Sequence, residues 1–486
     1  MSPAVKERAG LDRHIPVSVQ IKPHLSGGAT LDAVDQIDRK RIAALTEAQQ
    51  ERFRNNTGAS AKTFQRAVKV MPNGVPSSFQ ENDPWPIYIE RGRGSRVWDV
   101  DGNEYTDFHN GFGVMCIGHA NPTVGAAVKA RIDEGTHFAA PTDGSIAVAE
   151  ELARRFGLPQ WRFNNSGTEA TMDAVHLARG ATGRDTILKI EGSYHGHHDT
   201  VMVSVYPPLE ALGARDDPVS VPYGGGVPEA MTALTRAVPF NDAGALQSVL
   251  EKIGEQVAGL IMEPAMMNIN IIPPREGYLE RVRELTAEHG VKLIFDEVKT
   301  GATISPGGAT ARFGVVPDMI TLAKASCGGY PGGAIGMSEE LAAIVADGTV
   351  KQYGTFNGNP LVMAAAEATL TEVLTDDVYE RFEATNRRLL DGCQQIVDGY
   401  DLPAYTEGMG AKGCVIFSPA RMHEYRDYLS DVDDDLSTLA WLYHMNHGIF
   451  MTPGVEEEWT LSIAHGDEDL QRYLDAFESF ARDVTA

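Results

Sequence analysis

Two apolar segments that end on charged side chains constrain the fold of this chain more than any other feature. The run VKLIFDE (291–297) ends on Asp296 and Glu297, and the run MITLAK (319–324) ends on Lys324, with a glycine-rich turn behind it. Short apolar runs bounded by turn residues are typical of buried strands. Because ligands bind beyond the carboxyl ends of the strands in doubly wound α/β sheets, we expect the acid and the lysine at a ligand site.

Further apolar runs alternate with helical patterns along the chain. Strands are predicted at residues 162–165, 185–192 and 258–264, and helices at 166–183 and 277–290. Strand, helix and strand at intervals of about 30 residues indicate right-handed βαβ units. The chain is therefore predicted to be an α/β protein whose large domain contains a mostly parallel sheet.

Four other segments carry simpler patterns. Residues 38–70 predict one or two helices, and short strands around an Asp-Gly-Asn hairpin turn are predicted between Ile87 and Phe108. The Pro- and Gly-bearing residues 206–238 are predicted to form a long surface excursion. The charged residues 421–435 are predicted to be a solvated face or loop.

These patterns divide the chain into four predicted parts. An N-terminal arm and helix (1–60) precede the N-terminal part of a smaller domain (61–110). A large α/β domain (111–375) contains the two charged strand ends, and a small α+β domain (376–486) follows it.

Composition and charge exclude several classes of protein. Of the 486 residues, 43% are hydrophobic, which is ample for a sizeable core and more than one domain. The formal net charge of −25 argues against nucleic acid or an anionic membrane as the main partner. The four cysteines include no CxxC pair, so neither a structural zinc site nor a disulfide framework is indicated. With no signal peptide and no apolar run of about 18 residues, we expect a cytoplasmic location.

The acid and the lysine suit one organic cofactor. Pyridoxal 5'-phosphate (PLP) needs a lysine for its aldehyde and an acid against its ring nitrogen. Asp296 would keep that nitrogen protonated, so that the ring accepts the electrons of a carbanion. Burial of Lys324 would lower its pKa and favour the neutral amine that forms a Schiff base. The alternatives are an acid satisfied by backbone donors and a lysine that extends to solvent.

A phosphate site is predicted where a strand leads into a helix. Ser166, Gly167 and Thr168 stand there, and free N–H groups together with the helix dipole favour an anion. A plain N-cap is the alternative. Past the next strand, Tyr194 is positioned to stack on a flat heterocycle. His195 and the two histidines after it suggest a metal instead, but without an HExxH pattern we predict no metal site.

Several motifs together resemble one enzyme family. They are SGTEA (166–170), YHG (194–196), FDEV-x-TG (295–301), PD with a lysine before glycines (317–329) and GTF-x-GNP (354–360). This set resembles the class III pyridoxal-phosphate aminotransferases, which have the type I fold of aspartate aminotransferase. Within that family the chain is most similar to glutamate-1-semialdehyde 2,1-aminomutases and their relatives.

The resemblance implies a role for each matching residue. Lys324 would be the Schiff-base lysine and proton carrier, with Asp296 on the ring nitrogen and Tyr194 stacked on the ring. The other cofactor-binding residues that it implies are Ser166, Gly167, Thr168, His195, Asn268, Val298 and Thr355. Thr355 would come from the partner subunit, which implies a homodimer. Glu263 and Glu457 match positions near the substrate or cofactor.

The expected substrate pocket departs from the aminomutase pattern. Ser77 stands where the aminomutases carry an arginine, and Phe112 stands where they carry a tryptophan. Where relatives have TGFR, this chain has TGAT (300–303). Neither customary carboxylate-binding position therefore holds an arginine. We predict a neutral pocket, with Ser77, Phe112 and Glu457 near a less charged or bulkier amine or carbonyl compound.

The predicted function is that of a PLP-dependent aminotransferase, which moves an amino group between an amine or amino acid and a carbonyl acceptor by a ping-pong mechanism. The alternative is a glutamate-1-semialdehyde 2,1-aminomutase, which moves the amine within one molecule, and epimerase or racemase chemistry is a further possibility. A non-catalytic binding protein on the same fold and a metal hydrolase built on HGHHD (195–199) are remote alternatives.

Overall fold

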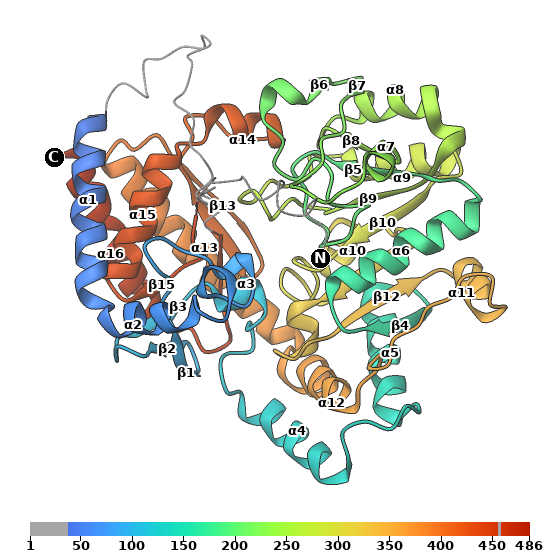
Figure 1. Cartoon of the computed structure of the whole chain (residues 1–486), viewed down its shortest axis with the longest axis horizontal. Helices are drawn as coiled ribbons and strands as arrows, with labels where there is room; N and C mark the ends of the chain where they lie inside the picture. Colours follow the sequence, from blue (N-terminus) through green and yellow to red (C-terminus); the bar gives the residue numbers. More distant parts are fainter. Residues whose placement is uncertain (1–36, 455–457) are drawn as a thin grey trace, which may run out of the picture.

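A seven-stranded sheet forms the centre of the larger part of the molecule (Figure 1). The computed structural model describes residues 37–454 and 458–486, so the predicted N-terminal arm lies outside the described residues. Along the sheet the strands are β4 (Gln160–Asn164), β12 (Gly333–Met337), β11 (Met319–Ala323), β10 (Lys292–Asp296), β9 (Val257–Met262), β5 (Thr186–Ile190) and β8 (Thr235–Val238).

The pairing of these strands confirms a mostly parallel sheet. From β11 to β8 every neighbouring pair is parallel, whereas β12 is antiparallel to both β11 and β4. All residues of β9 and β11 are buried, as expected for strands that are covered on both faces. Asp296 pairs with Thr321, so the end of β10 lies beside the end of β11 and brings Asp296 close to Lys324.

Helices cover this sheet and continue its βαβ order. They are α5 (Asp143–Phe156), α6 (Gly167–Thr182), α7 (Glu229–Ala233), α8 (Ala243–Ile253), α9 (Tyr278–Glu288), α10 (Gly308–Phe313), α11 (Glu339–Ala346) and α12 (Pro360–Ala368). α6 packs against β9, β11 and β12 through small buried residues such as Ala174 and Ala178. α12 packs against α5 and against α4 (Pro122–Glu134), which extends away from the sheet (Figure 1).

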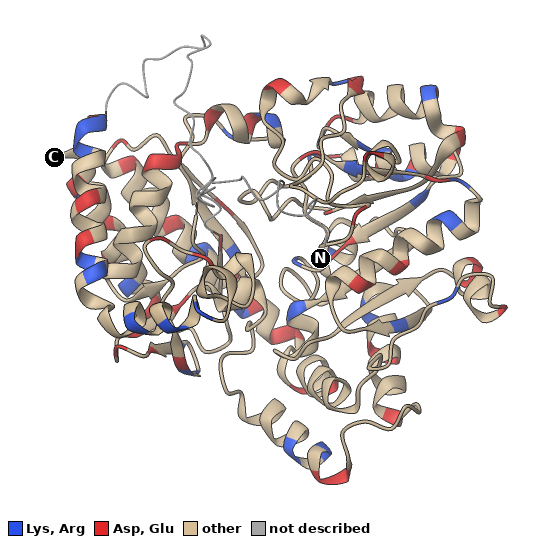
Figure 2. Cartoon of the chain, in the orientation of Figure 1, with Lys and Arg blue, Asp and Glu red and all other residues tan. Residues whose placement is uncertain are grey.

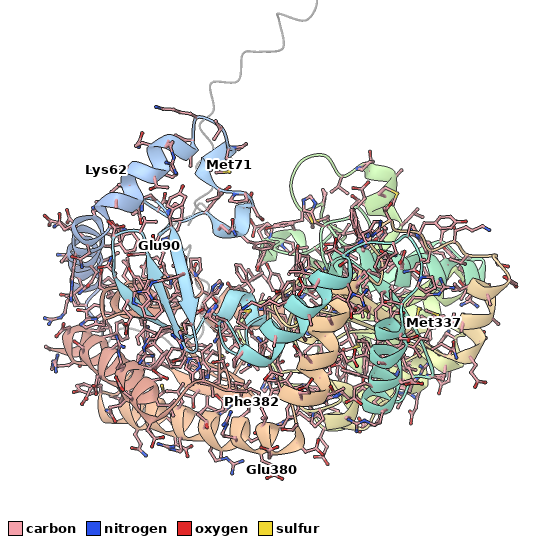
Figure 3. All side chains as sticks on the ribbon, turned by 90° about the horizontal axis from the view of Figure 1, so that it is seen from below. Lys62, Met71, Glu90, Met337, Glu380 and Phe382 are labelled. Carbon is pink, nitrogen blue, oxygen red and sulfur yellow. The ribbon has the colours of Figure 1, made fainter. Side chains whose placement is uncertain are left out.

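The smaller part is built from both ends of the described chain. Its first sheet joins β1 (Ile89–Arg93), β2 (Arg96–Asp99), β3 (Glu104–Asp107) and β15 (Ile449–Phe450), and its second joins β13 (Tyr405–Met409), β14 (Lys412–Ile416) and β16 (Glu458–Thr460). The helices beside them are α1 (Arg39–Asn56), α2 (Gly58–Ala67), α13 (Asp376–Gly399), α15 (Asp434–Asn446) and α16 (Asp467–Thr485). Lys62 and Glu90 lie in this part and Met337 lies in the other (Figure 3).

Two predictions about the segments between elements are wrong in part. The predicted excursion at residues 206–238 contains the short hairpin of β6 (Gly213–Ala214) and β7 (Asp217–Pro218), but it ends in β8, an edge strand of the main sheet. Thr235, Ala237 and Val238 are buried there, because the apolar end of the segment pairs with β5. The strand predicted from Ile87 begins two residues later, at Ile89.

The charged segment 421–435 is not simply a solvated loop. It contains α14 (Tyr425–Asp431), in which Tyr425 and Tyr428 are buried. Arg426 pairs with the buried Glu191, which follows β5, at 2.8 Å. The charge in this segment therefore serves a contact between the two parts of the molecule, which a composition argument does not reveal.

Charged side chains of both signs lie along the outer helices (Figure 2). Within the described part of the chain, no helix has both the length and the apolar character needed to cross a membrane. The predicted domain boundaries at residues 60, 110 and 375 stay predictions.

Candidate active site

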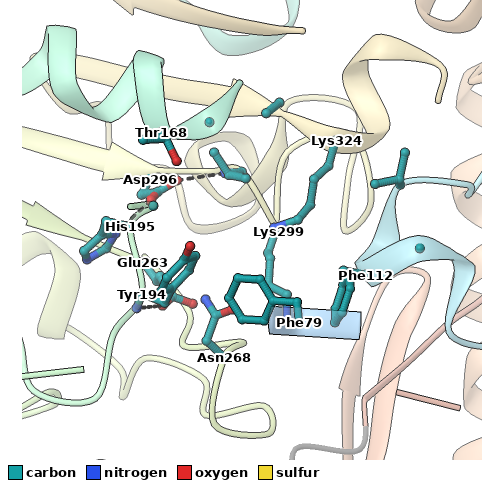
Figure 4. Close-up of a pocket in the computed structure, with 16 residues that line it drawn as sticks. Phe79, Phe112, Thr168, Tyr194, His195, Glu263, Asn268, Asp296, Lys299 and Lys324 are labelled. Carbon is teal, nitrogen blue, oxygen red and sulfur yellow. Dashed lines mark hydrogen bonds and ion pairs between the residues drawn. The ribbon is translucent and has the colours of Figure 1, made fainter. Parts of the chain in front are cut away.

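A cavity of about 310 Å³ lies beyond the carboxyl ends of β10 and β11 (Figure 4). Most of the predicted site residues line it: Phe112, Gly167, Thr168, Tyr194, His195, Asn268, Asp296, Val298 and Lys324. Phe79, Glu263 and Lys299 line the same cavity. The remaining predicted residues, Ser77, Ser166 and Thr355, lie outside its lining, and Glu457 lies outside the described residues.

Lys324 follows directly on β11 and begins a tight 3-10 turn. Its φ of 47° is in the left-handed region, where a lysine is held only if the surrounding structure enforces it. Burial, together with the charges of Lys299 and Lys412, lowers the pKa of Lys324 to about 8, against the opposing effect of Asp296 and Glu458. Much more of this amine is therefore neutral near neutral pH than in an ordinary lysine, as a nucleophile or base requires.

Asp296 is held by a short chain of hydrogen bonds. Its Oδ2 lies 2.7 Å from Nδ1 of His195, and its Oδ1 accepts from the backbone N–H of Val298 at 3.0 Å and from Thr321 at 3.1 Å. Nε2 of His195 is in turn 2.8 Å from the hydroxyl of Ser193. These partners orient the buried carboxylate toward the cavity, so His195 contributes by positioning Asp296.

The N-terminus of α6 forms one wall of the cavity. Ser166 acts as the N-cap, because its hydroxyl accepts from the N–H of Glu169 at 3.2 Å. The backbone of Gly167 and the side chain of Thr168 line the cavity instead. A Cβ on Gly167 would lie 3.0 Å from Val298, so glycine permits the close approach of the two. Free N–H groups in the first turn of a helix make this wall suitable for an anion.

Three aromatic rings in contact with one another line the cavity. Phe79 makes edge contacts with Phe112, at a centroid distance of 5.7 Å, and with Tyr194, at 5.4 Å. The backbone N–H of Tyr194 donates to the buried Glu263 at 3.0 Å, which fixes the loop that carries the ring. From the loop in which Ser77 was predicted to reach the substrate, it is Phe79 that lines the cavity, whereas Ser77 is exposed.

The prediction of a neutral pocket stays a prediction, and it left out Lys299, which lines the cavity together with Lys324, Glu263 and Asp296. Its Nζ lies 2.8 Å from Oε1 of Glu458, a residue of β16 in the smaller part of the molecule. The sequence carried a signal for this residue: Lys299 stands three positions after Asp296, at the same strand end. Lys299 lies outside the two positions at which the family customarily carries an arginine.

The side chains of the three histidines in HGHHD (195–199) lie in different surroundings. His195 contacts Asp296, His198 lies 3.3 Å from the hydroxyl of Thr171, and His197 is exposed. Within residues 37–454 and 458–486, no three or more His, Cys, Asp or Glu side chains are grouped as metal ligands.

Thr355 lies on an exposed loop ahead of α12. Asn357 of this loop accepts a hydrogen bond at 3.0 Å from Asn165, which precedes the N-terminus of α6. Tyr353 and Phe356 beside it are 84% and 55% exposed, which is unusual for large apolar rings. In a single chain, Thr355 does not contact the cavity.

Comparison of this chain with known proteins identifies its family. Residues 78–435 match the family model described as aminotransferase class-III. The chain belongs to the class III aminotransferases. A glutamate-1-semialdehyde 2,1-aminomutase 2 from Exiguobacterium sibiricum is 38% identical to it over 429 residues, which cover 87% of this chain and 96% of that protein.

Solved structures agree with this class III assignment. An aminomutase of the same kind from Pseudomonas aeruginosa PAO1, in complex with PMP, matches with a TM-score of 0.85 and 30% identity over 92% of this chain and all 100% of that one. An omega-transaminase from Sphaerobacter thermophilus matches with a TM-score of 0.82 and 32% identity, over 88% of this chain and 98% of that one. The predicted type I fold and family are confirmed, and the protein is a PLP-dependent enzyme of the aminotransferase class.

The cavity of this class III aminotransferase fits PLP. A lysine with a lowered pKa and an oriented carboxylate lie at neighbouring strand ends, as the aldehyde and the ring nitrogen of the cofactor require. Gly167 and Thr168 bring the N-terminus of α6, with its free N–H groups, to the cavity wall, where they suit a phosphate, and Tyr194 offers a flat ring. The residues that the sequence nominated for the ring are therefore present in one cavity.

Proposed function

We propose that this enzyme is an intermolecular aminotransferase, which takes an amino group from an amine or amino acid and passes it to a separate carbonyl compound by a ping-pong mechanism. The observation that carries the proposal is the meeting of Lys324 and Asp296 in one cavity, next to the N-terminus of α6. Bound there, PLP supplies an electron sink for the carbanion that forms at the substrate carbon.

Lys324 has two tasks in this proposal. Its Nζ would hold the cofactor through the aldehyde group, and as a free amine it would carry a proton away from the substrate carbon. The pKa of about 8 supports both tasks, since the amine can be neutral when it attacks and can still accept a proton.

Asp296 would hold the ring nitrogen in its protonated form. The hydrogen bonds from His195, Val298 and Thr321 hold the carboxylate in one orientation, so little reorganisation is needed as charge develops on the ring. We assign Gly167 and Thr168 to the phosphate, with Ser166 shaping the same turn as its N-cap. Tyr194, Val298 and Asn268 are assigned to the ring and its edge.

We also propose that the enzyme is a homodimer in which Thr355 reaches the phosphate site of the partner subunit. Support comes from a group of exposed apolar residues around α4, α5 and the loop before α12: Ile132, Phe138, Ile146, Tyr353 and Phe356. Phe356 contacts His137, and Asn359 donates to the carbonyl of Thr136, so these segments form one surface, the α4–α12 patch. Large exposed apolar patches mark interaction sites.

A cytoplasmic location is part of the proposal. All four cysteines, Cys116, Cys327, Cys393 and Cys414, are buried free thiols, which suits a reducing compartment. Fractionation of the source cells would test this location, and recovery of the enzyme outside the cytoplasmic fraction would contradict it.

A glutamate-1-semialdehyde 2,1-aminomutase remains a second candidate. The observation in its favour is the 38% identity to a protein with that name. The absence of an arginine at Ser77 and in the TGAT segment argues for a different substrate.

Spectroscopy of the purified holoenzyme separates the two candidates. A panel of amines and amino acids would be added without a carbonyl acceptor, and the visible absorbance of the lysine-bound cofactor would be followed. Stoichiometric loss with one donor, reversed by a keto compound, is the result expected for an aminotransferase. Absorbance that persists with every donor, together with turnover of glutamate semialdehyde, would identify an aminomutase.

A further inference from the structure

A buried group of two lysines and one glutamate lies beside the active-site cavity. Lys299 belongs to the loop after β10, whereas Lys412 and Glu458 lie on the neighbouring strands β14 and β16. Nζ of Lys299 and Nζ of Lys412 lie 2.8 Å and 2.9 Å from the same oxygen of Glu458, Oε1. We call these three residues the buried triad. It joins the two parts of the molecule at the cavity.

The triad contains more positive than negative groups. Burial by itself raises the pKa of Glu458, but the ammonium groups of Lys299 and Lys412 hold that pKa below its ordinary value, so the glutamate is ionised. Lys412 is fully buried and also donates to the hydroxyl of Thr460 at 3.1 Å. Lys412 can therefore compensate the negative charge of Glu458 within the smaller part of the molecule. Lys299 adds a second positive charge beside the same carboxylate.

Lys299 has a hydrogen-bond donor left for a ligand. An ammonium group carries three N–H donors. Among the described residues, Nζ of Lys299 donates to the carbonyl of Met267 and pairs with Glu458. Its side chain lines the cavity and exposes 12% of its surface, whereas Lys412 exposes none. The remaining donor is thus available from the cavity.

The surroundings of Lys299 define the kind of ligand. Phe79 and Phe112 line the same cavity, together with Lys324 (Figure 4). Both rings are apolar, and they pack against each other. The carboxylates of Glu263 and Asp296 also line the cavity, but their oxygens already accept hydrogen bonds from the protein. A cation beside two apolar rings favours a ligand that combines one anionic group with an apolar body, because an uncompensated buried charge is costly.

We propose that Lys299 binds the carboxylate of the enzyme's substrates, so that they are amino acids and keto acids with an apolar body. The proposal rests on the aminotransferase function proposed above and adds the substrate class to it. Because no arginine stands at Ser77 or in the TGAT segment, Lys299 in the loop after β10 would bind the substrate carboxylate instead. If Lys299 were only a link between the two parts of the molecule, its loss would affect charged and neutral ligands equally.

Calorimetry on the holoenzyme tests this proposal without turnover. The two probes are 3-phenylpropanoate and 3-phenylpropanamide, which share an apolar body and differ in charge. Wild-type enzyme is expected to bind the acid about 10- to 100-fold more tightly than the amide, as a charge-assisted hydrogen bond would give. Lys299→Met is expected to remove this preference. Equal affinity of the wild-type enzyme for both probes would overturn the proposal, and this comparison does not depend on the folding of a variant.

A double variant separates substrate binding from a linking role. Glu458→Gln combined with Lys412→Met removes one negative and one positive group and leaves Lys299 at the cavity. The preference for the acid is expected to persist in this variant. If it disappears as fully as in Lys299→Met, the triad acts as a structural link and the proposal fails.

A half-reaction distinguishes failure of this proposal from failure of the aminotransferase function. Alanine and isopropylamine differ only in that a methyl group replaces the carboxylate, and both are followed by loss of the visible absorbance. Lys299→Met is expected to slow the reaction with alanine about 10- to 100-fold more than the reaction with isopropylamine. Equal slowing would overturn the role of Lys299. If no donor of any kind reacts, the aminotransferase function fails, whereas calorimetry still decides on Lys299.

Discussion

At the scale of single residues, Lys324 combines three properties that rarely occur together. It is enclosed at a strand end, its backbone is left-handed, and its pKa lies near 8. Lys299 contributes to that pKa and also lines the cavity, so the lysine proposed to bind the substrate carboxylate also affects the amine of Lys324.

Replacement of Lys324 by alanine tests its role in proton transfer. Lys324→Ala is expected to lower kcat by more than about 100-fold, since a positioned acid–base group contributes roughly 10²- to 10⁴-fold, and to abolish the visible absorbance of the lysine-bound cofactor. Steady-state kinetics and an absorbance spectrum measure both effects. Lys252→Ala, at an exposed lysine of α8, serves as the control and should leave both unchanged. Turnover of Lys324→Ala near the wild-type rate would mean that another group is the base.

The lowered pKa of Lys324 predicts how cofactor loading depends on pH. Only the neutral amine attacks an aldehyde, so the rate at which apoenzyme takes up PLP should rise with pH and reach half of its plateau near pH 8, rather than near 10.5 as for an ordinary lysine. Lys299→Met should move this midpoint upward, because the charge of Lys299 helps to lower the pKa. Stopped-flow absorbance measures the rate, and a wild-type midpoint close to 10.5 would contradict the assignment.

Among the secondary-structure elements, the N-terminus of α6 forms the cavity wall that we assign to the phosphate. The position of this wall depends on the contact between α6 and the loop after β5. Gly196 of that loop has a φ of +101°, and a Cβ there would lie 2.6 Å from Oγ1 and 2.7 Å from Cα of Thr168. Both distances are too short for a methyl group. The loop therefore lies against the first turn of α6 only because residue 196 is a glycine.

Gly196→Ala is expected to weaken PLP binding by about tenfold or more, because the new methyl group displaces the first turn of α6. Gly226→Ala is a matched control: its φ of +100° makes a similar demand on the backbone, but a Cβ there meets nothing within 4 Å. Titration of apoenzyme with PLP gives the two dissociation constants, and thermal unfolding gives the backbone effect that the two variants share. Equal loss of PLP affinity in both variants would show that the contact with Thr168 is not responsible.

At the scale of the whole molecule, the cavity is one part of a site whose proposed last component belongs to another chain. The α4–α12 patch is apolar and exposed, and Thr355 belongs to the loop within it. Burial of large apolar side chains such as Tyr353 and Phe356 would stabilise a dimer by roughly 1.5–3 kcal/mol for each side chain. Assembly and cofactor binding should therefore be linked.

Phe356→Asp is expected to shift the enzyme toward monomer and to weaken PLP binding at the same time. A charge in the centre of an apolar interface is costly unless it is paired. Light scattering coupled to size exclusion measures the oligomeric state, and PLP titration measures the affinity. Val219→Asp, at a valine that is 50% exposed outside the patch, should leave both unchanged. A Phe356→Asp protein that stays dimeric with wild-type affinity would remove the patch from the interface.

The features of this protein that could be predicted from its sequence follow from local rules. Apolar runs that end on Asp296 and Lys324 predicted two buried strands with their charged ends at the ligand-binding edge of a sheet, and βαβ spacing predicted the parallel sheet. The structure shows that the two strands are neighbours. Each of these rules needs only neighbouring residues, because strand burial and helix starts are encoded within a few positions. The family motifs are also short and local. Together with Asp296 and Lys324 they predicted the cofactor.

Which residues far apart in sequence share the cavity could not be predicted, because it depends on how the two parts of the molecule pack together. Lys299 meets Glu458 and Lys412 through the packing of the larger part on the smaller one, and no spacing rule connects them. The same packing put Phe79 rather than Ser77 into the cavity wall, and it made α14 a contact between the two parts of the molecule. The charge of the substrate pocket is therefore a property of the folded chain, because it depends on which charges are buried together.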